Sequence, residues 1–529
     1  MSSAPKQSNS TPFFYHHLPK NLLLILLSFI CLPVTATLVL LSLYSSRTTP
    51  NAPKREQKQD QDAKQNAKAR DQVPITILVT GVSMTKGLSI ARLLSQYTPH
   101  LILGADVEHI PNTSPGRYSR SLTAFFPLTP PDANSAEPYI ESLAHLIRAT
   151  NVDLWISCSS VVSAVEDGEV VRRVEKGIRE RNWDGRIFKA VQFSEDVVQE
   201  LHSKDRFLEF VRGIGEVVPE THRCESPDAV VRILKKERKG TVGNTDAKKN
   251  GRRKDEKKDM RYILKPIGVD DRARGNMMTL LPLPTVKETT EYISTLSIGK
   301  SNPYILQQYI SGPEYCTHAL VIRGVVQAFV ACPSSDLLMH YEALDPSAPL
   351  TQDMLRFTEK VAKEKGENFT GHLSFDFLAE GDREGEKSEL FPIECNPRAH
   401  TAVVLFQDEP RMAQRYLDIF SASSERPHAK QDVLVPEMQC PRYYWAGHDL
   451  VALVIIPVLD LLWGQASVAD VKKGGWEFWT HLRDWRDGTF EAWDPVPFLV
   501  LYHVYWPMKF LESVLNGKQW SRTTKIFEC

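Results

Sequence analysis

The feature that most constrains this chain is an uncharged apolar run near its N-terminus, from Leu22 to Tyr44. As a helix rising about 1.5 Å per residue, a run of this length covers roughly the 30 Å hydrocarbon layer of a bilayer. A secretory signal has a shorter apolar stretch followed by small residues at a cleavage site, and this run fits that description poorly. The sequence therefore predicts a transmembrane helix at 22–44, preceded by a short N-terminal tail at 1–21.

Basic residues around this run predict which side of the membrane the rest of the chain occupies. Lys6 and Lys20 precede the run, whereas five basic residues follow it within the next 20 positions. Positive charge is biased toward the cytoplasmic side of a span, so we expect a single-pass membrane protein whose catalytic domain faces the cytosol. A net charge of −1 offers no global field for nucleic acid, and no nucleic-acid partner is expected.

The remaining chain is too long for one core and divides by composition. None of its eight cysteines forms a C-x-x-C pair, so the sequence suggests neither a cysteine zinc site nor a redox motif. We expect a polar linker at 45–72, a small doubly wound α/β domain at 73–195, a second α/β domain at 196–420 with a basic insertion at 235–260, and an aromatic-rich region at 421–529.

The small α/β domain is predicted from a strand, a glycine turn, a helix and a second strand, which form a βαβ unit. Its turn, from Gly81 to Gly87, lacks the spacing of a Walker phosphate loop, so we reject it as the nucleotide site. A plain strand-to-helix turn is the simpler interpretation. Contact with substrate through its amides and Lys86 is the alternative.

The aromatic-rich region contains eight of the ten tryptophans, all after residue 440. They lie beside apolar runs at 450–463 and 496–515, and tryptophan beside short apolar stretches suits a membrane interface. Neither run makes a second span, because the first is short and contains Asp460 and the second contains charged residues. Membrane contact and an ordinary aromatic-rich subdomain both remain open.

The sharpest local pattern is a predicted hairpin, in which two short strands with acidic residues are joined by a charged loop. Asp376 lies on the first strand, and Glu394 and Asn396 lie on the next. Side chains of a strand repeat direction every two residues, so Glu394 and Asn396 face the same way. Two carboxylates and an amide oxygen are the hard ligands that Mg²⁺ prefers. Arg398 follows, and its guanidinium suits a phosphate or a substrate anion.

Two lysines and a tight turn precede this hairpin in the chain. Lys204 starts an amphipathic helix, and Lys265 ends an apolar strand. A further strand, PYILQQYI, leads into a turn that holds Gly312 and Glu314. Alone, each of these residues is a weak signal. Together with the acidic hairpin they match what phosphoryl transfer from ATP requires, which is cations that contact the phosphates and carboxylates that bind the metal.

In this order the motifs resemble the ATP-grasp superfamily across residues 200–400: a first lysine, a lid-strand lysine, a hinge strand ending in G-P-E, and an Asp…E-x-N-x-R hairpin. The resemblance implies an ATP-grasp fold preceded by the doubly wound domain, ATP as cosubstrate, and Mg²⁺ with Mn²⁺ as a substitute. Position by position, it implies phosphate contacts by Lys204 and Lys265, an adenine slot lined by Gln307, Gln308 and Ile310, a ribose contact by Glu314, and metal binding by Asp376, Glu394 and Asn396.

A narrower pattern, which includes YILQQYISGPEYCTHALV, IECNPRAHTAVVLF and WDPVPFLVLYHVYWP, resembles the mycosporine-glycine synthase family. These ligases join glycine to 4-deoxygadusol, a cyclohexenone-type acid. The resemblance implies that the enolic oxygen attacks the γ-phosphate while Lys265 and Arg398 offset charge, and that the amine then displaces phosphate. Candidate proton shuttles are His318, His340, His372 and His400, with His400 preferred because it follows the metal strand.

Two alternatives are kept. The first is a carboxylate–amine ligase that makes a dipeptide-type product through an acyl phosphate, because the ATP motifs do not distinguish the substrates. The second is an inactive membrane protein that senses nucleotide or scaffolds partner enzymes. The expected partners are a small acid, an amino acid and the membrane, and the sequence leaves a homodimer open.

Overall fold

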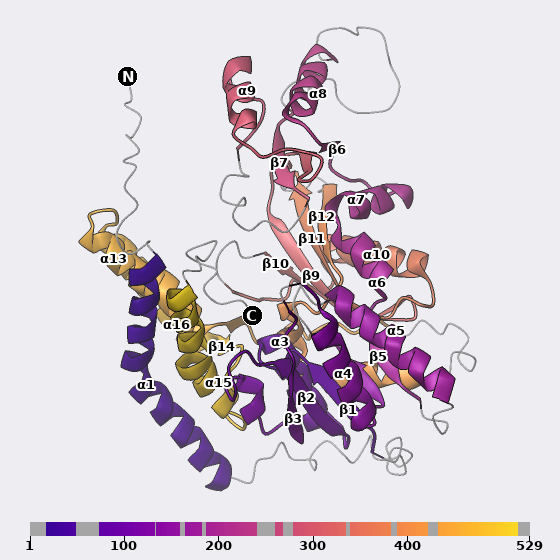
Figure 1. Cartoon of the computed structure of the whole chain (residues 1–529). Coiled ribbons are helices and arrows are strands. Elements are labelled where there is room, and N and C mark those ends of the chain that lie inside the picture. Colours follow the sequence, from indigo (N-terminus) through magenta and orange to yellow (C-terminus); the bar gives the residue numbers. More distant parts are fainter. Residues whose placement is uncertain are drawn as a thin grey trace.

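The computed structural model describes residues 17–48, 74–132, 134–158, 164–181, 187–240, 260–267, 279–334, 339–381, 389–421 and 432–516. Most of the expected polar linker and most of the basic insertion lie outside these residues. Within them the chain is a mixed α/β protein, as expected. Figure 1 shows a parallel sheet at one end, a four-stranded sheet in the middle, and helices α8 and α9 at the other end.

The N-terminal domain is a five-stranded parallel sheet in the order β3-β2-β1-β4-β5. Its strands are β1 (Thr76–Thr80), β2 (Leu101–Val107), β3 (Ala124–Leu128), β4 (Leu154–Ile156) and β5 (Lys189–Val191). Its helices are α3 (Thr85–Tyr97), the 3₁₀ turn η3 (Pro115–Tyr118), α4 (Glu137–Ala149) and α5 (Ala164–Arg181). The central strands are apolar and buried because helices cover both faces of the sheet.

The strand order reverses between β1 and β4, and open α/β sheets bind ligands outside the carboxyl ends of strands at such a point. Gly81 turns the chain directly after β1 with a φ of +72°. A Cβ atom there would lie 2.4 Å from the carbonyl oxygen of Cys158, which follows β4, so only glycine fits.

Two antiparallel sheets follow, one in the order β6-β8-β7 and one in the order β10-β9-β11-β12. Their strands are β6 (Thr221–Cys224), β7 (Tyr262–Pro266), β8 (Tyr304–Gln308), β9 (Glu314–Ile322), β10 (Val325–Pro333), β11 (Gly371–Glu380) and β12 (Glu389–Asn396). The accompanying helices are α6 (Glu195–His202), α7 (Lys204–Gly213), α8 (Pro227–Gly240), α9 (Val286–Ser294) and α10 (Pro349–Lys365).

The C-terminal region is mostly helical. It comprises η7 (Thr401–Phe406), α11 (Pro410–Leu417), η8 (Asp418–Phe420), β13 (Tyr443–Tyr444), α12 (Ala446–Asp449), the π-helix η9 (Leu450–Ile455), α13 (Ile456–Leu462), α14 (Val468–Asp484), β14 (Arg486–Asp487), α15 (Val496–Val500), the π-helix η10 (Leu501–Tyr505) and α16 (Trp506–Asn516). A fully buried ion pair, with Arg92 Nε 2.9 Å from the Asp494 carboxylate, joins this region to α3.

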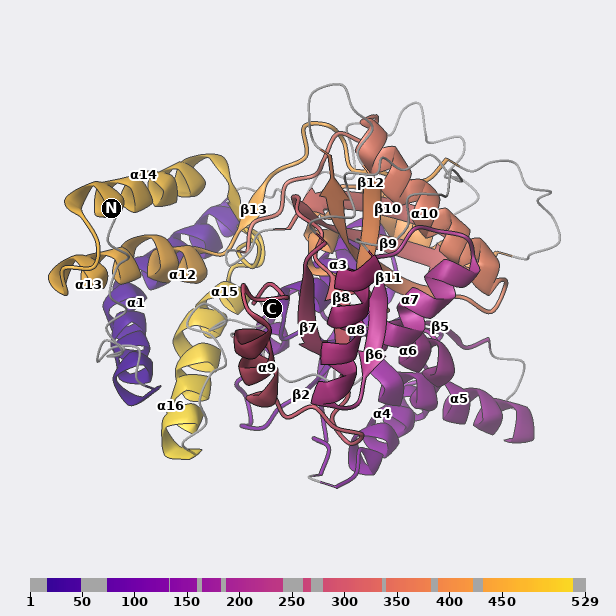
Figure 2. The same cartoon turned by 90° about the horizontal axis from the view of Figure 1, so that it is seen from above.

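The N-terminal helix α1 (His17–Thr48) is longer than the expected 22–44 span. It is the one helix among the described residues that is long and apolar enough to cross a membrane, judged by length and composition. It lies along α15, η10 and α16 (Figures 1 and 2). The Ser28 hydroxyl donates to the Tyr502 carbonyl (2.9 Å), and the Thr35 hydroxyl lies 2.5 Å from the His503 ring, so α1 is docked on the C-terminal helices.

Candidate functional site

The acidic residues meet on the β11–β12 hairpin, where antiparallel pairing sets Asp376 opposite Glu394 and Ser374 opposite Asn396. The Asn396 side-chain amide donates to Asp376 Oδ2 at 3.2 Å. The register shifts directly after Asp376, and such bulges re-aim side chains beside functional sites. The predicted hairpin is therefore present, with its acid and amide groups at one place.

Two cations close around these groups. Lys204 begins α7, and its Nζ lies 3.7 Å from the Glu394 carboxylate. Arg398 follows β12, and its Nη2 donates to Asn396 Oδ1 at 3.3 Å. A lysine, an arginine, two carboxylates and an amide thus form one cluster, named here the carboxylate cluster: Lys204, Asp376, Glu394, Asn396 and Arg398.

The electrostatics of the carboxylate cluster favour an added cation. Burial, together with the negative charges of Glu394 and Glu314, raises the pKa of Asp376 to about 8, although Arg398 and Lys204 oppose the shift. A cation bound beside this carboxyl group would favour its charged form. Its oxygen donors are those of a divalent hard cation, so the residues present fit Mg²⁺.

Glu314 joins this environment from the next strand, because β9 pairs with β11 and places Glu314 opposite Leu378. The Ser334 hydroxyl donates to its carboxylate at 3.0 Å. The turn before Glu314 passes very close to β11: a Cβ at Gly312 would lie 1.8 Å from the Ala379 carbonyl oxygen. The glycine of the G-P-E sequence is required by this close approach.

The other predicted nucleotide contacts lie on the three-stranded sheet. Lys265 on β7 donates to the side-chain oxygen of Gln307 on β8, at 3.0 Å, and Gln307 is buried. The Gln308 side-chain oxygen accepts from the backbone N–H of Glu220 at 3.1 Å, and Ile310 is buried after β8. The predicted site residues are thus divided between two sheets, with the carboxylates on one and the adenine-slot residues on the other.

Three of the four candidate histidines gather where the parallel sheet meets the four-stranded sheet. The backbone N–H of His400 donates to His318 Nδ1 at 3.3 Å, and the His318 and His372 rings lie 5.4 Å apart. His372 Nδ1 lies 3.3 Å from the carbonyl oxygen of Ser157, at the end of β4. These three histidines therefore lie beside the point where the strand order of the parallel sheet reverses. His340 lies elsewhere, beside Asp449.

These imidazoles are neutral at physiological pH. Burial, with repulsion from Arg398 and Lys86, lowers the pKa of His400 to about 3. Burial and Lys86 lower the pKa of His372 to about 4. Lys86 is buried in the first turn of α3. The glycine turn before α3 therefore places a lysine close enough to affect the pKa values of His372 and His400. An anion bound here would meet Lys86 and Arg398.

Sequence reasoning did not single out His202, Ser334 or Tyr416. His202 precedes Lys204 by two residues, and the charges of Glu394 and Arg398 both act on its pKa, which burial lowers. The Tyr416 hydroxyl lies 2.9 Å from His372 Nε2. Proximity to Lys204 could have indicated His202, whereas Ser334 and Tyr416 come from elements with no local pattern that points to the site.

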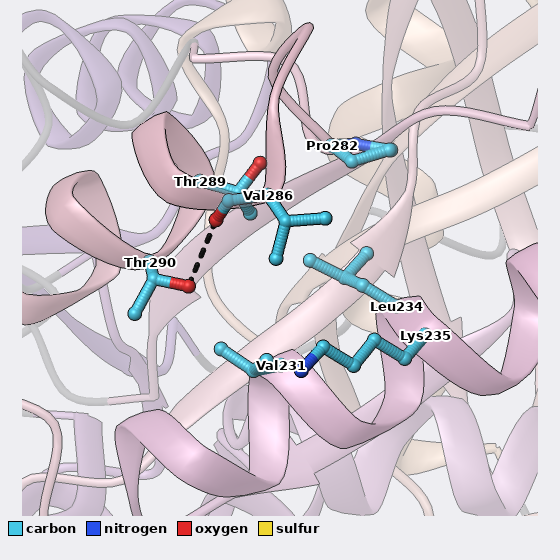
Figure 3. A pocket seen from close by; sticks show the side chains of 7 residues that line it. All are labelled: Val231, Leu234, Lys235, Pro282, Val286, Thr289 and Thr290. Atoms are coloured by element: carbon cyan, nitrogen blue, oxygen red, sulfur yellow. Dashed lines mark hydrogen bonds between the residues drawn. The ribbon is translucent and has the colours of Figure 1, made fainter.

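One further pocket lies between α8 and α9 (Figure 3). Its lining is largely apolar and includes Leu234, Pro282 and Val286. None of the predicted site residues contributes to it, so it is not the candidate site.

Comparison with known proteins gives neither a matching family model nor a matching curated protein. Solved structures do show similarity. An L-amino acid ligase from Bacillus licheniformis is 11% identical, with a TM-score of 0.39, over 63% of this chain and 68% of that one.

Two further similar structures contain ADP. The biotin carboxylase domain of Hydrogenobacter thermophilus 2-oxoglutarate carboxylase, with MgADP and bicarbonate, is 14% identical with a TM-score of 0.44, over 69% of this chain and 72% of that one. N5-carboxyaminoimidazole synthetase from Staphylococcus aureus, with ADP, is 14% identical with a TM-score of 0.41, over 64% and 74%.

Proposed function

We propose that this chain is an ATP-grasp ligase that forms a C–N bond and releases ADP and phosphate. The observation that carries the proposal is the carboxylate cluster, in which Asp376, Glu394 and Asn396 share one end of a hairpin with two cations against it. The raised pKa of Asp376, which results from burial and from the charges of Glu394 and Glu314, supports a metal ion there. Phosphoryl transfer depends on this combination of cations and metal-binding carboxylates.

In this proposal Asp376, Glu394 and Asn396 hold Mg²⁺, with Mn²⁺ as a substitute, and the metal offsets charge on the ATP phosphates. Lys204 and Lys265 contact phosphates, and Arg398 stabilises charge on the transferred group. Gln307, Gln308 and Ile310 line the adenine slot, and Glu314 contacts ribose. Lys265 and Gln307 already contact each other, which keeps the lysine oriented in the absence of nucleotide.

For the substrates we propose 4-deoxygadusol and glycine. The acid is an anionic vinylogous acid, and the region beside Lys86, Arg398 and the neutral histidines supplies cations and proton acceptors for it. The strand-order reversal of the parallel sheet is also where such folds bind small ligands. We therefore propose that Lys86 contacts the substrate, which is the second of the two interpretations given above for the glycine turn.

The proposed reaction has two steps, phosphorylation of the acid and displacement of the phosphate by the amine. The enolic oxygen of the acid attacks the γ-phosphorus of ATP, the bond to the bridging oxygen breaks, and ADP leaves. The glycine nitrogen then adds to the phosphorylated carbon, loses a proton, and phosphate leaves to give the enaminone. His400 is the proposed proton acceptor. Burial is the main reason for its low pKa, and bound anions beside Arg398 and Lys86 would offset the part that is due to repulsion.

The test uses the purified full chain with ATP, Mg²⁺, 4-deoxygadusol and one amino acid at a time, with ADP release and product mass as readouts. The proposal predicts ADP release that needs both 4-deoxygadusol and glycine. Turnover with an ordinary carboxylic acid and an amine, without 4-deoxygadusol, would instead identify a dipeptide-type ligase. No ADP release with any pair would favour the inactive nucleotide-sensing scaffold.

We further propose that α1 anchors the chain in a membrane with the catalytic domains in the cytosol. Because α1 is docked on η10 through Ser28 and Thr35, the C-terminal helices would reach the membrane with it. Exposed aromatic residues on α14, Trp476 and Trp479, support lipid contact. Flotation with vesicles should weaken when both tryptophans are changed to serine. Unchanged flotation would leave α1 as the sole contact.

A further inference from the structure

Apart from the proposed ATP site, the chain contains a second cluster of metal-ligand side chains: His340, Asp449 and His481. Their ligand atoms all lie within 4.8 Å of one another. His340 Nε2 is 2.9 and 3.1 Å from the two Asp449 oxygens, and His481 Nδ1 is 2.6 Å from Asp449 Oδ2. None of these residues belongs to the carboxylate cluster.

Three separate segments deliver these side chains. Tyr341 and Tyr443 exchange backbone hydrogen bonds of 2.9 Å, which fixes the position of the neighbouring His340. Asp449 ends α12, where the π-helix η9 begins, and His481 lies in the last turn of α14. Helical segments of the π type are rare and occur frequently at functional sites.

Close packing holds α14 against η9. Gly474 of α14 lies so near that a Cβ there would be 2.1 Å from the carbonyl oxygen of Leu453. His481 follows two turns later on the same helix, so this approach also sets its distance from Asp449. The three ligand groups are thus placed by the fold rather than by flexible side chains reaching out from the surface.

The charge of Asp449 is the second reason to consider a cation. Its side chain has no exposed surface, and among the described ion pairs both its partners are histidines rather than lysine or arginine. A carboxylate removed from water is costly unless positive charge is supplied. A bound divalent ion would place positive charge directly on this buried carboxylate.

From these observations we infer that His340, Asp449 and His481 form a binding site for a divalent transition-metal ion, with Zn²⁺ as the first candidate and water as the fourth ligand. Two imidazole nitrogens and one carboxylate oxygen form a donor set that suits such ions better than Mg²⁺. Zinc ligands at about 2.0–2.2 Å from the metal lie roughly 3.3 Å apart in a tetrahedron. Entry of the ion therefore needs the His340–Asp449 contacts to open by about 0.2–0.4 Å and the His481–Asp449 contact to open by about 0.7 Å.

This ion would be structural. It would tie the loop that carries His340 to α12 and α14 in the C-terminal helical region. The next residue, Tyr341, packs its ring against His400 and Trp445, with centroids 5.6 and 5.7 Å apart. The metal would therefore steady a side chain beside the proposed proton acceptor without taking part in phosphoryl transfer, and the inference stands whether or not the proposed function is right.

The competing description is a metal-free tie in which both imidazoles donate N–H groups to Asp449. The two descriptions differ in protons, because metal binding requires both facing nitrogens to be deprotonated. They also differ in metal content, which can be measured without any activity assay.

The first experiment measures the zinc, cobalt, nickel, copper, iron and manganese content of the detergent-purified full chain by mass spectrometry. We expect about one equivalent of transition metal per chain in the wild type and in the matched control Glu394→Gln, which alters only the carboxylate cluster. We expect loss of that metal in His481→Gln and in His340→Gln. His340 is partly exposed, so its variant tests the site with less risk to folding.

The second experiment titrates Co²⁺ into chelator-treated wild-type protein and follows its visible absorption and tryptophan fluorescence. The Trp485 ring lies 4.7 Å from His481 and 5.2 Å from His340, so a bound Co²⁺ should quench it, and Trp485→Phe should remove that part of the signal. Wild-type protein with neither bound transition metal nor Co²⁺ uptake would overturn the inference in favour of the metal-free tie. Metal uptake unchanged in both histidine variants would overturn it as well.

Discussion

Two aspartates of this chain differ in how their charge is balanced. Asp494 is fully buried and bonded by Arg92 Nε at 2.9 Å and by the Ser119 hydroxyl at 2.6 Å. Asp376 keeps some exposed surface, but burial and the charges of Glu394 and Glu314 raise its pKa to about 8. The balanced group holds two regions of the fold together, whereas the unbalanced group lies at the proposed metal site.

The largest effect should come from breaking the balanced pair. Arg92→Ala would leave Asp494 buried without its cation, and loss of one partner of a buried pair costs about 3–5 kcal/mol. Chemical unfolding would measure the loss. Lys287→Ala is the control, because Lys287 forms an exposed pair with Glu291, and it should leave the free energy of unfolding essentially unchanged. Equal losses of stability in the two variants would show that the buried Arg92–Asp494 pair stabilises the fold no more than an exposed pair does.

The unbalanced group should behave in the opposite way. Asp376→Asn should lower kcat/KM roughly 1000-fold, because it removes a proposed metal ligand, while the metal-free protein keeps its stability. Glu389→Gln on the same hairpin is the matched control and should keep near-normal turnover. Coupled-enzyme detection of ADP would measure both, and an active Asp376→Asn protein would contradict the proposed role.

A smaller kinetic effect is expected at His400. His400→Gln should lower kcat roughly 100-fold through loss of the proton acceptor. In the protein without substrate the pKa of the His400 imidazole is about 3. The pH profile of kcat/KM should therefore show no decrease in activity at the ordinary pKa of a histidine. Such a decrease, present in wild type and absent in His400→Gln, would show that the imidazole is not held neutral.

The last prediction concerns the pH dependence of stability, an effect that is spread over several pH units. Folding raises the pKa of Asp376 from 3.8 to about 8, so the folded state holds this proton more tightly than the unfolded chain does. The stabilising contribution is therefore complete below the lower value and is lost as pH rises toward the upper one. Thermal unfolding should show this decline in metal-free protein, and added Mg²⁺ should reduce it. Asp376→Asn should abolish the dependence on Mg²⁺.

Local pattern was sufficient for much of the fold and for the core of the site. Apolar strands and the glycine turn predicted the βαβ unit. Two adjacent short strands joined by a charged loop predicted the hairpin that pairs Asp376 with Glu394. The separation of two residues predicted that Glu394 and Asn396 share a face of their strand. These features depend on contacts between neighbouring elements, and such contacts leave a periodic signature in the sequence.

Contacts between distant segments could not be predicted in this way. Arg92 and Asp494 are separated by 402 residues, and no periodicity connects them. The docking of α1 on α16, the gathering of His318, His372 and His400, and the separate placement of His340 likewise follow from tertiary packing. The sequence favoured His400 because it follows the metal strand, but it could not predict that His318 and His372 lie beside His400 while His340 lies beside Asp449.

The central claim is that Asp376, Glu394 and Asn396 bind a divalent ion that holds ATP. Calorimetric titration of ATP into the full chain, with and without Mg²⁺, tests it most directly, with Glu394→Gln as the comparison. We predict Mg²⁺-dependent ATP binding in the wild type, weakened at least roughly tenfold in Glu394→Gln. Equal ATP binding by both proteins, or binding indifferent to Mg²⁺, would contradict it.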